Sequence, residues 1–453
     1  MNEKELSRRE LIRLLGGSGL AAGLGSTITP TPAQADPACR TDAPKGVKVE
    51  GADHPPATVV DGKVIQPKRQ LPVLHKTDVL VVGGGPAGVV AALAAKRAGA
   101  NVALVERYGH LGGLWTGGLV LLVIGHIVKG GKQVCQGIGE EMMRRLEKLD
   151  HGIVNRRPGV NPTVDAEALK YVMVEMITEA KVDIFLHCWG VDAIMSGSAV
   201  RGAVFESKSG RQAILADSVV DATGDGDIFA AAGAQHERRR YHIGLVSRIG
   251  NLDKVDRGKA KGAPKPRHLG NVTPIPGANW VNMHGPDADG LDVVELTRLE
   301  LNARKLIWKN VRKIRQTPGY EKVYLMETAP QLGVRITRVL SGLHTLKMSD
   351  VKAGTRFPDV VAVGGAWSGD HQEWQIPYGA LVPKHVDNVL AAGRCISGET
   401  LMSDLIRVIP NCFVTGHAAG VAAAVASQDG CRVRDVEVPK VQGLLRKQEA
   451  YLG

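Results

Sequence analysis

The chain has 453 residues, of which 44% are hydrophobic and 23% are charged. That length is enough for two or three packed units, and the composition excludes disorder over most of the chain. The six cysteines show neither a Cys-x-x-Cys pair nor a metal-ligand spacing: Cys39, Cys135, Cys188, Cys395, Cys412 and Cys431. We therefore expect buried thiols rather than a disulfide framework, and no metal site. If the protein is exported, the alternative is that one or two pairs among these cysteines are oxidised.

The formal net charge is +11, and much of it comes from one stretch. Between His236 and Gly270, ten Lys and Arg stand against three Asp and Glu. This stretch has no helix-turn-helix spacing, no zinc-finger spacing and no interleaved aromatic residues, so we expect no nucleic-acid partner. We interpret it as a solvated basic loop. The alternative is an entry rim for an anionic substrate.

Residues 1–35 have the features of a twin-arginine export signal. Arg8 and Arg9 precede a Gly- and Ala-rich apolar run from Leu14 to Gly25, and Ala33-Gln34-Ala35 forms a small-x-small cleavage site. The run is shorter than the ~20 residues of a membrane span. We predict a periplasmic or secreted protein that meets the export machinery and has no stable membrane span. The alternative is a frayed helix at the start of a cytoplasmic protein.

Residues 36–72 are rich in Pro, Gly and charge, and we interpret them as a linker or surface arm. The apolar run Asp78–Val82 after them predicts a buried strand. A G-x-G-x-x-G pattern comes next, then an Ala-rich helix at Val89–Ala98, then a second strand at Val102–Val105 that ends in Glu106. Strand, glycines, helix and acidic strand end within one unit predict a dinucleotide-binding site.

Each residue of this unit has a physical task. Gly83 allows a tight turn, Gly85 lets a pyrophosphate approach the backbone, and Gly88 lets the helix lie close to the sheet. The helix N-terminus, which Pro86 and Ala87 lead into, offers free N–H groups and a partial positive charge to the phosphates, so Pro86 and Ala87 are expected at the cofactor. Glu106 is placed to accept hydrogen bonds from an adenosine ribose.

The segment after Glu106 carries a second glycine pair, Gly112-Gly113. A Glu followed closely by such a pair resembles the FAD-binding families related to glutathione reductase and fumarate reductase. In those families the second loop runs along the pyrophosphate and the ribityl chain. The resemblance therefore implies FAD rather than NAD, with Arg107, Gly112, Gly113 and Thr116 at the cofactor.

Later segments extend this resemblance. Ala222-Thr223-Gly224-Asp225 resembles the strand end that these flavoproteins place near the cofactor, which implies roles for Gly224 and Asp225. Asp387–Cys395, with Gly393 and Arg394, resembles their last cofactor strand. The small-residue helix that begins at Thr415-Gly416 would then aim its N-terminus at the flavin.

Taken together, the chain is similar to the bacterial FAD-dependent oxidoreductase family over roughly residues 76–430. Gln331–Arg335 and Ile376–Lys384 belong to the same pattern. Ile336 departs from it, because the family often has an acidic residue there, so we expect no salt bridge at this position. A second fingerprint and a redox cysteine pair, which an NADPH-coupled disulfide reductase needs, are missing from the sequence.

The resemblance implies an α/β fold: a Rossmann-like, glutathione-reductase-like FAD-binding domain with a β-rich insertion and an α+β cap or substrate domain. We expect the FAD-binding domain at residues 73–235 and 379–453 and the cap at 236–378. The apolar spacing predicts three further helices and three strand-like stretches. These are Glu140–Leu149, Asp165–Ala180 and Val293–Ile314, and then Val182–Cys188, Val200–Ser207 and Ala213–Val220.

Candidate catalytic residues come from loops that such a fold brings over the flavin. His371, in a polar and aromatic loop, can act as acid or base near neutral pH, with a surface or structural His as the alternative. Arg335 and Arg338 can both reach one anion if their segment is helical. Arg407, next to Asp404, is a further candidate. For each arginine, a structural ion pair is the alternative.

The sequence thus predicts an exported FAD-dependent oxidoreductase that transfers hydride to or from flavin N5. Its partner is a small organic substrate, with an anion among the candidates, and no oligomeric state is predicted. The alternative is a flavin-binding electron-transfer or accessory subunit of a periplasmic redox complex. His110 lies near the flavin loop, but its spacing differs from that of the covalent fumarate-reductase relatives. We therefore expect FAD to be bound non-covalently.

Overall fold

The computed structural model describes residues 56–157, 159–365 and 372–453. These described residues belong to one compact unit. The export signal predicted at residues 1–35 and the candidate His371 lie outside the described residues, so both stay predictions.

The centre of the fold is a seven-stranded sheet of order β7-β4-β3-β10-β9-β8, with β21 beside β10. Its strands are β3 (Val73–Val82), β4 (Val102–Val105), β7 (Asp183–Phe185), β8 (Trp189–Ser196), β9 (Ala199–Ser207), β10 (Gly210–Asp221) and β21 (Val389–Ala391). β7, β4, β3, β10 and β21 run parallel, and β8, β9 and β10 form an antiparallel meander. The predicted α/β, Rossmann-like fold class is confirmed.

The long strand β10 joins the parallel and antiparallel parts of this sheet. Its first half pairs with β9, and its last residues, Val219–Asp221, pair with β21. The predicted β-rich insertion is therefore continuous with the cofactor sheet. Strand β8 was not predicted, because most of its side chains are exposed or half-buried and give no apolar run.

The segment predicted as a linker contains a short antiparallel hairpin, β1 (Thr58–Val60) and β2 (Lys63–Ile65). Strand β3 then begins at Val73, earlier than the predicted Asp78. Its first residues are partly exposed, but they pair with β10, where Val73 lies opposite Ala213. Pairing with a distant strand, rather than a local apolar run, extends β3.

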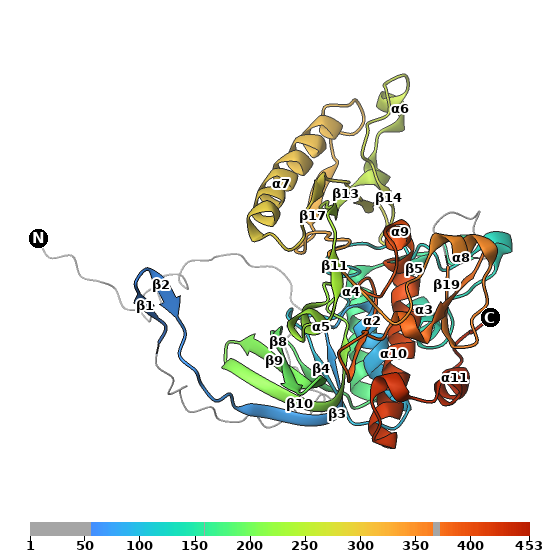
Figure 1. Cartoon of the computed structure of the whole chain (residues 1–453). Coiled ribbons are helices and arrows are strands. Elements are labelled where there is room, and N and C mark those ends of the chain that lie inside the picture. Colours follow the sequence, from blue (N-terminus) through green and yellow to red (C-terminus); the bar gives the residue numbers. More distant parts are fainter. Residues whose placement is uncertain (1–55, 158, 366–371) are drawn as a thin grey trace, which may run out of the picture. The chain divides into compact units, whose positions relative to one another are not determined.

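Helices α2 (Pro86–Arg97) and α10 (Ile409–Asp429) pack against each other beside the sheet (Figure 1). A Cβ on Gly416 would collide with the carbonyl oxygen of Ala87, so the two helix backbones touch there. Small residues make this close contact possible.

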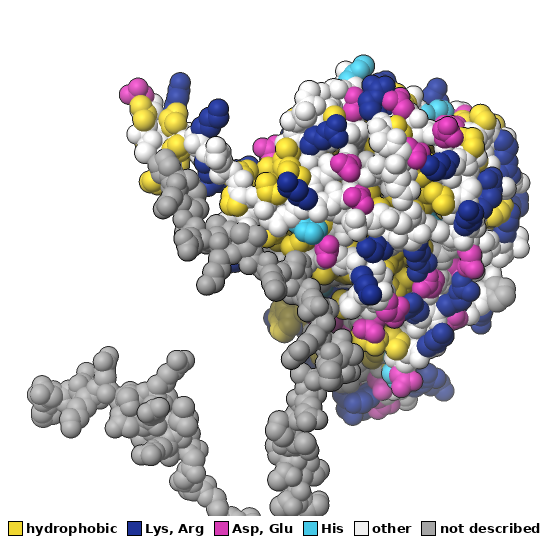
Figure 2. All heavy atoms as spheres, turned by 90° about the horizontal axis from the view of Figure 1, so that it is seen from below, with side chains coloured by type: hydrophobic (Ala, Val, Ile, Leu, Met, Phe, Trp, Pro, Cys, Tyr) yellow, Lys and Arg dark blue, Asp and Glu magenta, His cyan; other side chains and the backbone are white. Residues whose placement is uncertain are grey.

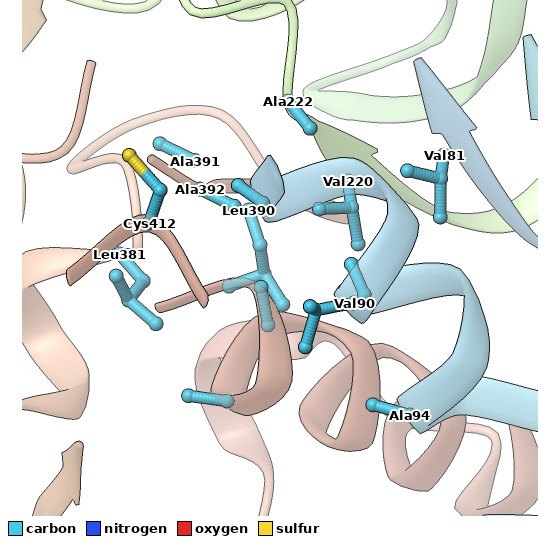
Figure 3. Packing of buried hydrophobic residues seen from close by; sticks show 14 of the residues in the cluster. Val81, Val90, Ala94, Val220, Ala222, Leu381, Leu390, Ala391, Ala392 and Cys412 are labelled. Atoms are coloured by element: carbon cyan, nitrogen blue, oxygen red, sulfur yellow. The ribbon is translucent and has the colours of Figure 1, made fainter. Parts of the chain in front are cut away.

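Figure 3 shows part of the resulting core, in which Val90 and Ala94 of α2 belong to one hydrophobic cluster with Val220 of β10 and Leu390 of β21. Among the described residues, one helix, α10, is long enough and apolar enough to cross a membrane. Of its apolar window, 94% is buried inside the fold. Here α10 serves as the central core helix.

The remaining helices of this part are α3 (Ile138–Glu147), α4 (Ala166–Glu179), α5 (Asp227–Ala231), α8 (Met348–Ala353), α9 (Ser403–Ile406) and α11 (Val438–Lys447). The predicted helices at 140–149 and 165–180 are confirmed as α3 and α4, with ends shifted by one or two residues. Asp165 caps α4 by accepting hydrogen bonds from the N–H groups of Glu167 and Ala168, at 2.9 and 3.0 Å.

A second region is built on a four-stranded antiparallel sheet of order β14-β15-β13-β17. Its elements are β13 (Ser247–Gly250), α6 (Arg257–Ala260), β14 (Asn271–Val272), β15 (Asn279–Val281), α7 (Val293–Arg315) and β17 (Tyr324–Thr328). The long helix α7 lies along this sheet (Figure 1) and buries Leu299, Ile307, Val311 and Ile314. The helix predicted at Val293–Ile314 is confirmed, and we call this region the cap.

Two-stranded ladders complete the described fold. They are β5 (Ile153–Val154) with β6 (Thr163–Val164), β11 (His236–Arg238) with β18 (Arg338–Leu340), β12 (Tyr241–His242) with β16 (Asp287–Ala288), and β19 (Val360–Gly364) with β20 (Trp374–Pro377).

Residues 336–365 and 372–378, predicted as part of the cap, pack elsewhere. Ile336, Val339, Val361 and Ile376 belong to the hydrophobic cluster of the central sheet, whereas the cap has its own smaller clusters. The pairing of β18 with β11 returns the chain to the main core before residue 378. The cap core thus ends near Leu332, and the division into separate domains stays a prediction.

The surface and the thiols are also described. Figure 2 shows a face on which Lys and Arg side chains are interspersed with Asp and Glu. The five cysteines within the described ranges are unpaired, and Cys135, Cys188, Cys395 and Cys412 are buried.

Candidate active site

A cavity of about 410 Å³ opens where the carboxyl ends of the parallel strands meet the cap. Its wall includes Gly83 after β3, Glu106 after β4, Ala222 after β10 and Ala392 after β21. This edge of a parallel sheet is where ligands of doubly wound folds bind. From the other side the wall is closed by residues of the cap.

The fingerprint glycines have three different environments. Gly83 has a φ of +104°, and its N–H donates to the Val105 carbonyl oxygen at 2.8 Å, which fixes the turn out of β3. A Cβ on Gly88 would collide with the carbonyl oxygen of Gly83, so Gly88 serves packing. Gly85 lines the cavity, and no atom lies within 4 Å of the position that its Cβ would take.

Glu106 is buried at the cavity wall. Its Oε2 accepts a hydrogen bond from the Gly84 N–H at 2.6 Å, and its Oε1 accepts one from the Tyr108 N–H at 2.9 Å. These contacts hold the carboxylate in place, and each oxygen keeps a lone pair for a further donor. Arg107 also lines the cavity, with its Cζ 4.8 Å from the ring centre of Tyr108.

The second glycine loop faces the first. Gly113 lines the cavity, and its Cβ would lie 3.1 Å from the Cα of Gly85. Gly112 and Thr116, predicted at the cofactor, do not line the cavity. The Gly112 N–H donates to the Gly84 carbonyl at 2.7 Å, and the Thr116 hydroxyl donates to the Leu111 carbonyl at 2.6 Å. Both residues therefore shape the loop from behind.

A similar division holds at the third segment. Gly224, Gly393 and Arg394 line the cavity, whereas Asp225 does not. The Asp225 Oδ1 accepts hydrogen bonds from the Arg394 Nη2 at 2.7 Å and from the Thr337 hydroxyl at 2.8 Å. Asp225 thus fixes the guanidinium of Arg394 beside the cavity.

Thr415 and Gly416 lie inside α10 rather than at its start, because the helix begins at Ile409. The Thr415 Oγ1 accepts a hydrogen bond from the Gly393 N–H at 3.1 Å, and Gly416 packs on α2. The residues of this helix that reach the cavity are Ile409 and Cys412. The N-terminus of α10, with its partial positive charge, therefore lies at the cavity as predicted from the family, six residues earlier in sequence.

The cap end of the cavity carries a group of polar side chains, the cap cluster: His242, Asn282, His284, Arg335, Asp404 and Arg407. The rings of His242 and His284 are 5.1 Å apart between centres. The Arg335 Nη1 donates to the His242 carbonyl oxygen at 2.8 Å, and its Nη2 donates to the Asn282 Oδ1 at 3.5 Å.

Arg407 has a different environment from Arg335. Its Nε donates to the Asp404 Oδ1 at 3.2 Å, and its Cζ lies 5.9 Å from the ring centre of Tyr241. The structural ion pair that was the alternative for Arg407 is therefore present, and the pair itself lines the cavity.

Burial and neighbouring charges set the protonation of the cap cluster. Burial, together with the positive charge of Arg407, lowers the pKa of Arg335 to about 10. Partial burial and the charge of Arg335 lower the pKa of both His242 and His284, so both rings are neutral at neutral pH. Burial opposes ionisation of Asp404, but the hydrogen bond from Tyr241 and the charge of Arg407 hold its pKa below the usual range.

Some candidates lie away from the cavity. The prediction that Arg335 and Arg338 reach one anion is wrong, because the segment is not helical: Arg338 begins β18 and donates to the Asp227 Oδ1 at 2.9 Å. His110 does not line the cavity but stacks on Tyr108.

Sequence reasoning missed His242 and His284. The first lies in the basic stretch that we interpreted as a solvated loop, and the second follows β15 in an irregular segment. Neither belongs to a cofactor motif, and only the tertiary fold brings them beside Arg335. No local pattern in the sequence marks either histidine as part of a site.

These features define a dinucleotide-binding protein whose cavity also carries a cluster of polar and charged side chains. The FAD dependent oxidoreductase family matches residues 78–254 and 255–445, and the chain belongs to this family.

Individual relatives match over shorter lengths. The chain is 31% identical over 162 residues to 6-methylpretetramide 4-monooxygenase of Streptomyces rimosus, which covers 33% of this chain and 38% of the relative. It is 46% identical over 61 residues to thiamine thiazole synthase of Aeropyrum pernix, covering 13% of this chain and 21% of the relative. The matched region thus spans less than half the length of these curated relatives.

Among solved structures, a geranylgeranyl bacteriochlorophyll reductase-like protein of Thermoplasma acidophilum has a TM-score of 0.45 at 15% identity, covering 83% of this chain and 84% of that one. The anhydrotetracycline hydroxylase OxyS of Streptomyces rimosus also has a TM-score of 0.45, at 12% identity, covering 82% and 66%.

The residues at the sheet end of the cavity fit FAD. The open position at Gly85 leaves room for a pyrophosphate against the backbone, and α2 begins there with its free N–H groups. Glu106 is fixed at the end of β4, where a ribose hydroxyl can donate to it. FAD is the cofactor of this family, and this end of the cavity can hold its adenosine and pyrophosphate.

Proposed function

We propose that the protein is an exported FAD-dependent oxidoreductase in which a small organic substrate, bound in the cap cluster, exchanges hydride with flavin N5. The observation that carries the proposal is one continuous cavity. It is lined by Gly85 and Glu106 at one end and by His242, Arg335 and Arg407 at the other. FAD, bound non-covalently, supplies the redox chemistry, and the chain supplies binding and proton movement.

The apolar wall between the two ends supports this proposal. Val120, Leu122, Val246 and Trp280 line the cavity between sheet and cap and exclude water from the bound molecules. Arg335 is positioned to bind an anionic or carbonyl oxygen of the substrate. Arg407, which donates a hydrogen bond to Asp404, lines the same cavity as Arg335.

The proton role was predicted for His371, whose position is not described. His242 and His284 line the cavity, and because both rings are neutral either can accept a proton from a bound substrate. We propose His242 for this step, since its own carbonyl holds Arg335 and its ring is the less exposed of the two.

The alternative is a flavin-binding electron-transfer or accessory subunit. Such a subunit needs no substrate site, whereas this cavity ends in a polar cluster that can orient a small molecule. A screen of small organic acids, alcohols, amines and ketones against the FAD-loaded protein under anaerobic conditions separates the two. Bleaching or reoxidation of the flavin by a small molecule supports the enzyme, and no response except to a redox protein supports the subunit.

The export part of the proposal rests on Arg8 and Arg9. Replacing both by Lys should leave an FAD-loaded precursor in the cytoplasm, because the export receptor recognises the arginine pair. Cell fractionation followed by immunoblotting measures this. Unchanged export of the Lys-Lys variant would contradict the twin-arginine route.

A further inference from the structure

We infer that the cap cluster binds the carboxylate of a small, singly charged substrate with an apolar body, and that Arg335 is the residue that recognises it. This inference rests on the proposed function and specifies its substrate class. It comes from the charge balance, the hydrogen bonds and the lining of the cavity.

The cap cluster contains two arginines but only one carboxylate, that of Asp404. Arg407 forms an ion pair with Asp404. Arg335, by contrast, has no carboxylate partner among the residues that the structure describes, and its protein acceptors are the His242 carbonyl and the Asn282 amide oxygen. A half-buried cation with only neutral partners is costly, and an anionic ligand removes that cost. One positive charge is therefore left for the substrate.

The geometry favours a carboxylate. A guanidinium presents N–H groups in a planar fork that matches two carboxylate oxygens, and two of these groups are used by the protein contacts of Arg335. The neutral rings of His242 and His284 can each donate one hydrogen bond to the same headgroup.

The surroundings limit the ligand's charge and body. Asp404 carries a negative charge in the same cluster, so a doubly charged headgroup would be repelled. The same cavity is also lined by Val120, Leu122, Val246 and Trp280, which suit an aliphatic or aromatic body. The expected substrate is thus a monocarboxylate such as an aryl or alkyl acid.

Benzoate is a suitable probe, with benzamide as its uncharged isostere and phthalate as a doubly charged relative. Binding to the FAD-loaded protein is followed by perturbation of the flavin absorbance. Benzoate should bind at least about 10-fold more tightly than either relative, as expected for a charge-assisted hydrogen bond. Equal binding of benzoate and benzamide would overturn the inference.

Arg335→Gln should weaken the binding of benzoate by about 10- to 100-fold and leave the affinity for benzamide unchanged. Arg338→Gln is the matched control, since Arg338 pairs with Asp227 away from the cavity, and it should bind benzoate normally. An FAD content equal to that of the unmodified protein shows that each variant is folded. Loss of benzoate binding in the control, or none in Arg335→Gln, would refute the role of Arg335. A protein that binds no FAD at all would instead refute the proposed function.

A second inference rests on a different observation, the outer face of α7. Val294, Leu301 and Trp308 follow each other at seven-residue spacing and are 74%, 58% and 58% exposed. Arg298 and Lys305 lie between them along the helix and are also exposed. We propose that this face docks on an anionic lipid surface.

The helix presents this face rigidly. Leu299, Ile307 and Ile314 on its opposite side are buried in the cap. Seven residues are close to two helical turns, so the three exposed apolar residues lie on one side of α7, over roughly 21 Å of its length.

The charge of α7 selects the partner. The helix contains seven Lys and Arg against Glu295 and Glu300, and these two are already paired with Arg240 and Arg304. A second copy of this cationic face would be repelled, whereas anionic headgroups would be attracted. Exposed Trp and Leu between cationic residues are typical of helices that lie at a membrane interface.

Flotation with vesicles tests this proposal. The FAD-loaded protein should float with vesicles of phosphatidylcholine and phosphatidylglycerol and not with phosphatidylcholine alone. The double variant Leu301→Ser with Trp308→Ala should reduce flotation by about 10-fold or more. A high salt concentration should likewise reduce flotation of the unmodified protein, because it screens the attraction between Lys or Arg and the anionic headgroups. Tyr171→Ala, which removes an aromatic residue 54% exposed on α4, should have no effect. The proposal would be overturned if the double variant floated as well as the unmodified protein. It would also be overturned if the unmodified protein were a dimer and the double variant a monomer.

Discussion

The two ends of the cavity are built in different ways. At the sheet end, the wall is mostly backbone: glycines at strand ends, helix N-termini and one carboxylate held by two N–H groups. At the cap end, the wall is made of side chains from four separate segments, around His242, Asn282, Arg335 and Arg407. A backbone site needs a local sequence pattern, whereas a side-chain site needs only that the fold bring its residues together. We therefore expect the sheet end to bind the cofactor common to the family and the cap end to determine which substrate is bound.

The first prediction is a variant at the sheet end that loses FAD binding but still folds. Gly85 has a φ of −70° and an empty Cβ position, so Gly85→Val should fold normally. Its side chain would occupy the space for the pyrophosphate, and we expect FAD affinity to fall by about 100-fold or more. Flavin released by acid precipitation and the thermal midpoint without FAD measure the two properties.

Two glycines serve as controls for that variant. Gly443→Val, in α11, also meets no atom within 4 Å and should keep FAD. Gly88→Ala should lower the thermal midpoint, because its Cβ would collide with Gly83. Normal FAD content in Gly85→Val would show that the cofactor does not approach this turn.

The next effect concerns proton movement at the cap end. His242→Asn keeps a polar side chain but removes the base, and flavin reduction by the substrate should slow by ~10²–10⁴-fold with FAD still bound. Stopped-flow absorbance gives the rate. His371→Ala provides the comparison with the sequence prediction. If the rate of flavin reduction fell by that factor in His371→Ala and did not fall in His242→Asn, His371 rather than His242 would be the residue that moves the proton.

A buried histidine of the sheet region should make stability depend on pH. Burial lowers the pKa of His417 from 6.5 to about 4, and its Nε2 lies 2.9 Å from the Gln448 Oε1. The unfolded chain binds the proton at higher pH than the folded chain, so stability is lost as pH falls from about 6.5 toward 4. The loss attributable to His417 should be about 3 kcal/mol at most.

Urea unfolding between pH 7 and 4 measures this loss. His417→Gln carries no titrating group and should flatten that part of the profile. His126, whose pKa burial also lowers to about 4, would keep the remainder. An unchanged profile in His417→Gln would show that this ring is not neutral in the folded protein.

The smallest effect decides whether Thr415 contacts the cofactor. Thr415→Val removes the acceptor for the Gly393 N–H and should cost about 1–3 kcal/mol of stability, because that donor is buried. FAD affinity should change by less than about 3-fold, since Thr415 lies behind the cavity wall. A large loss of FAD affinity at unchanged stability would instead support direct contact.

The sequence alone determined the cofactor unit of this protein. A strand, three glycines, a helix and an acidic strand end lie within Asp78–Glu106, and each is specified by residues a few positions apart. The same locality explains why α3, α4 and α7 were predicted nearly to their ends: an amphipathic spacing is a property of one segment.

Only the tertiary structure decided the rest. Strand β8 and the first residues of β3 form because they pair with distant strands. Arg335 and Arg338 have different partners because the segment between them is not helical. His242, His284 and Arg335 meet through the pairing of β12 with β16 and the packing of the cap, over separations that no local pattern records. Backbone sites follow from short-range sequence, whereas a cluster of side chains depends on how the whole chain packs.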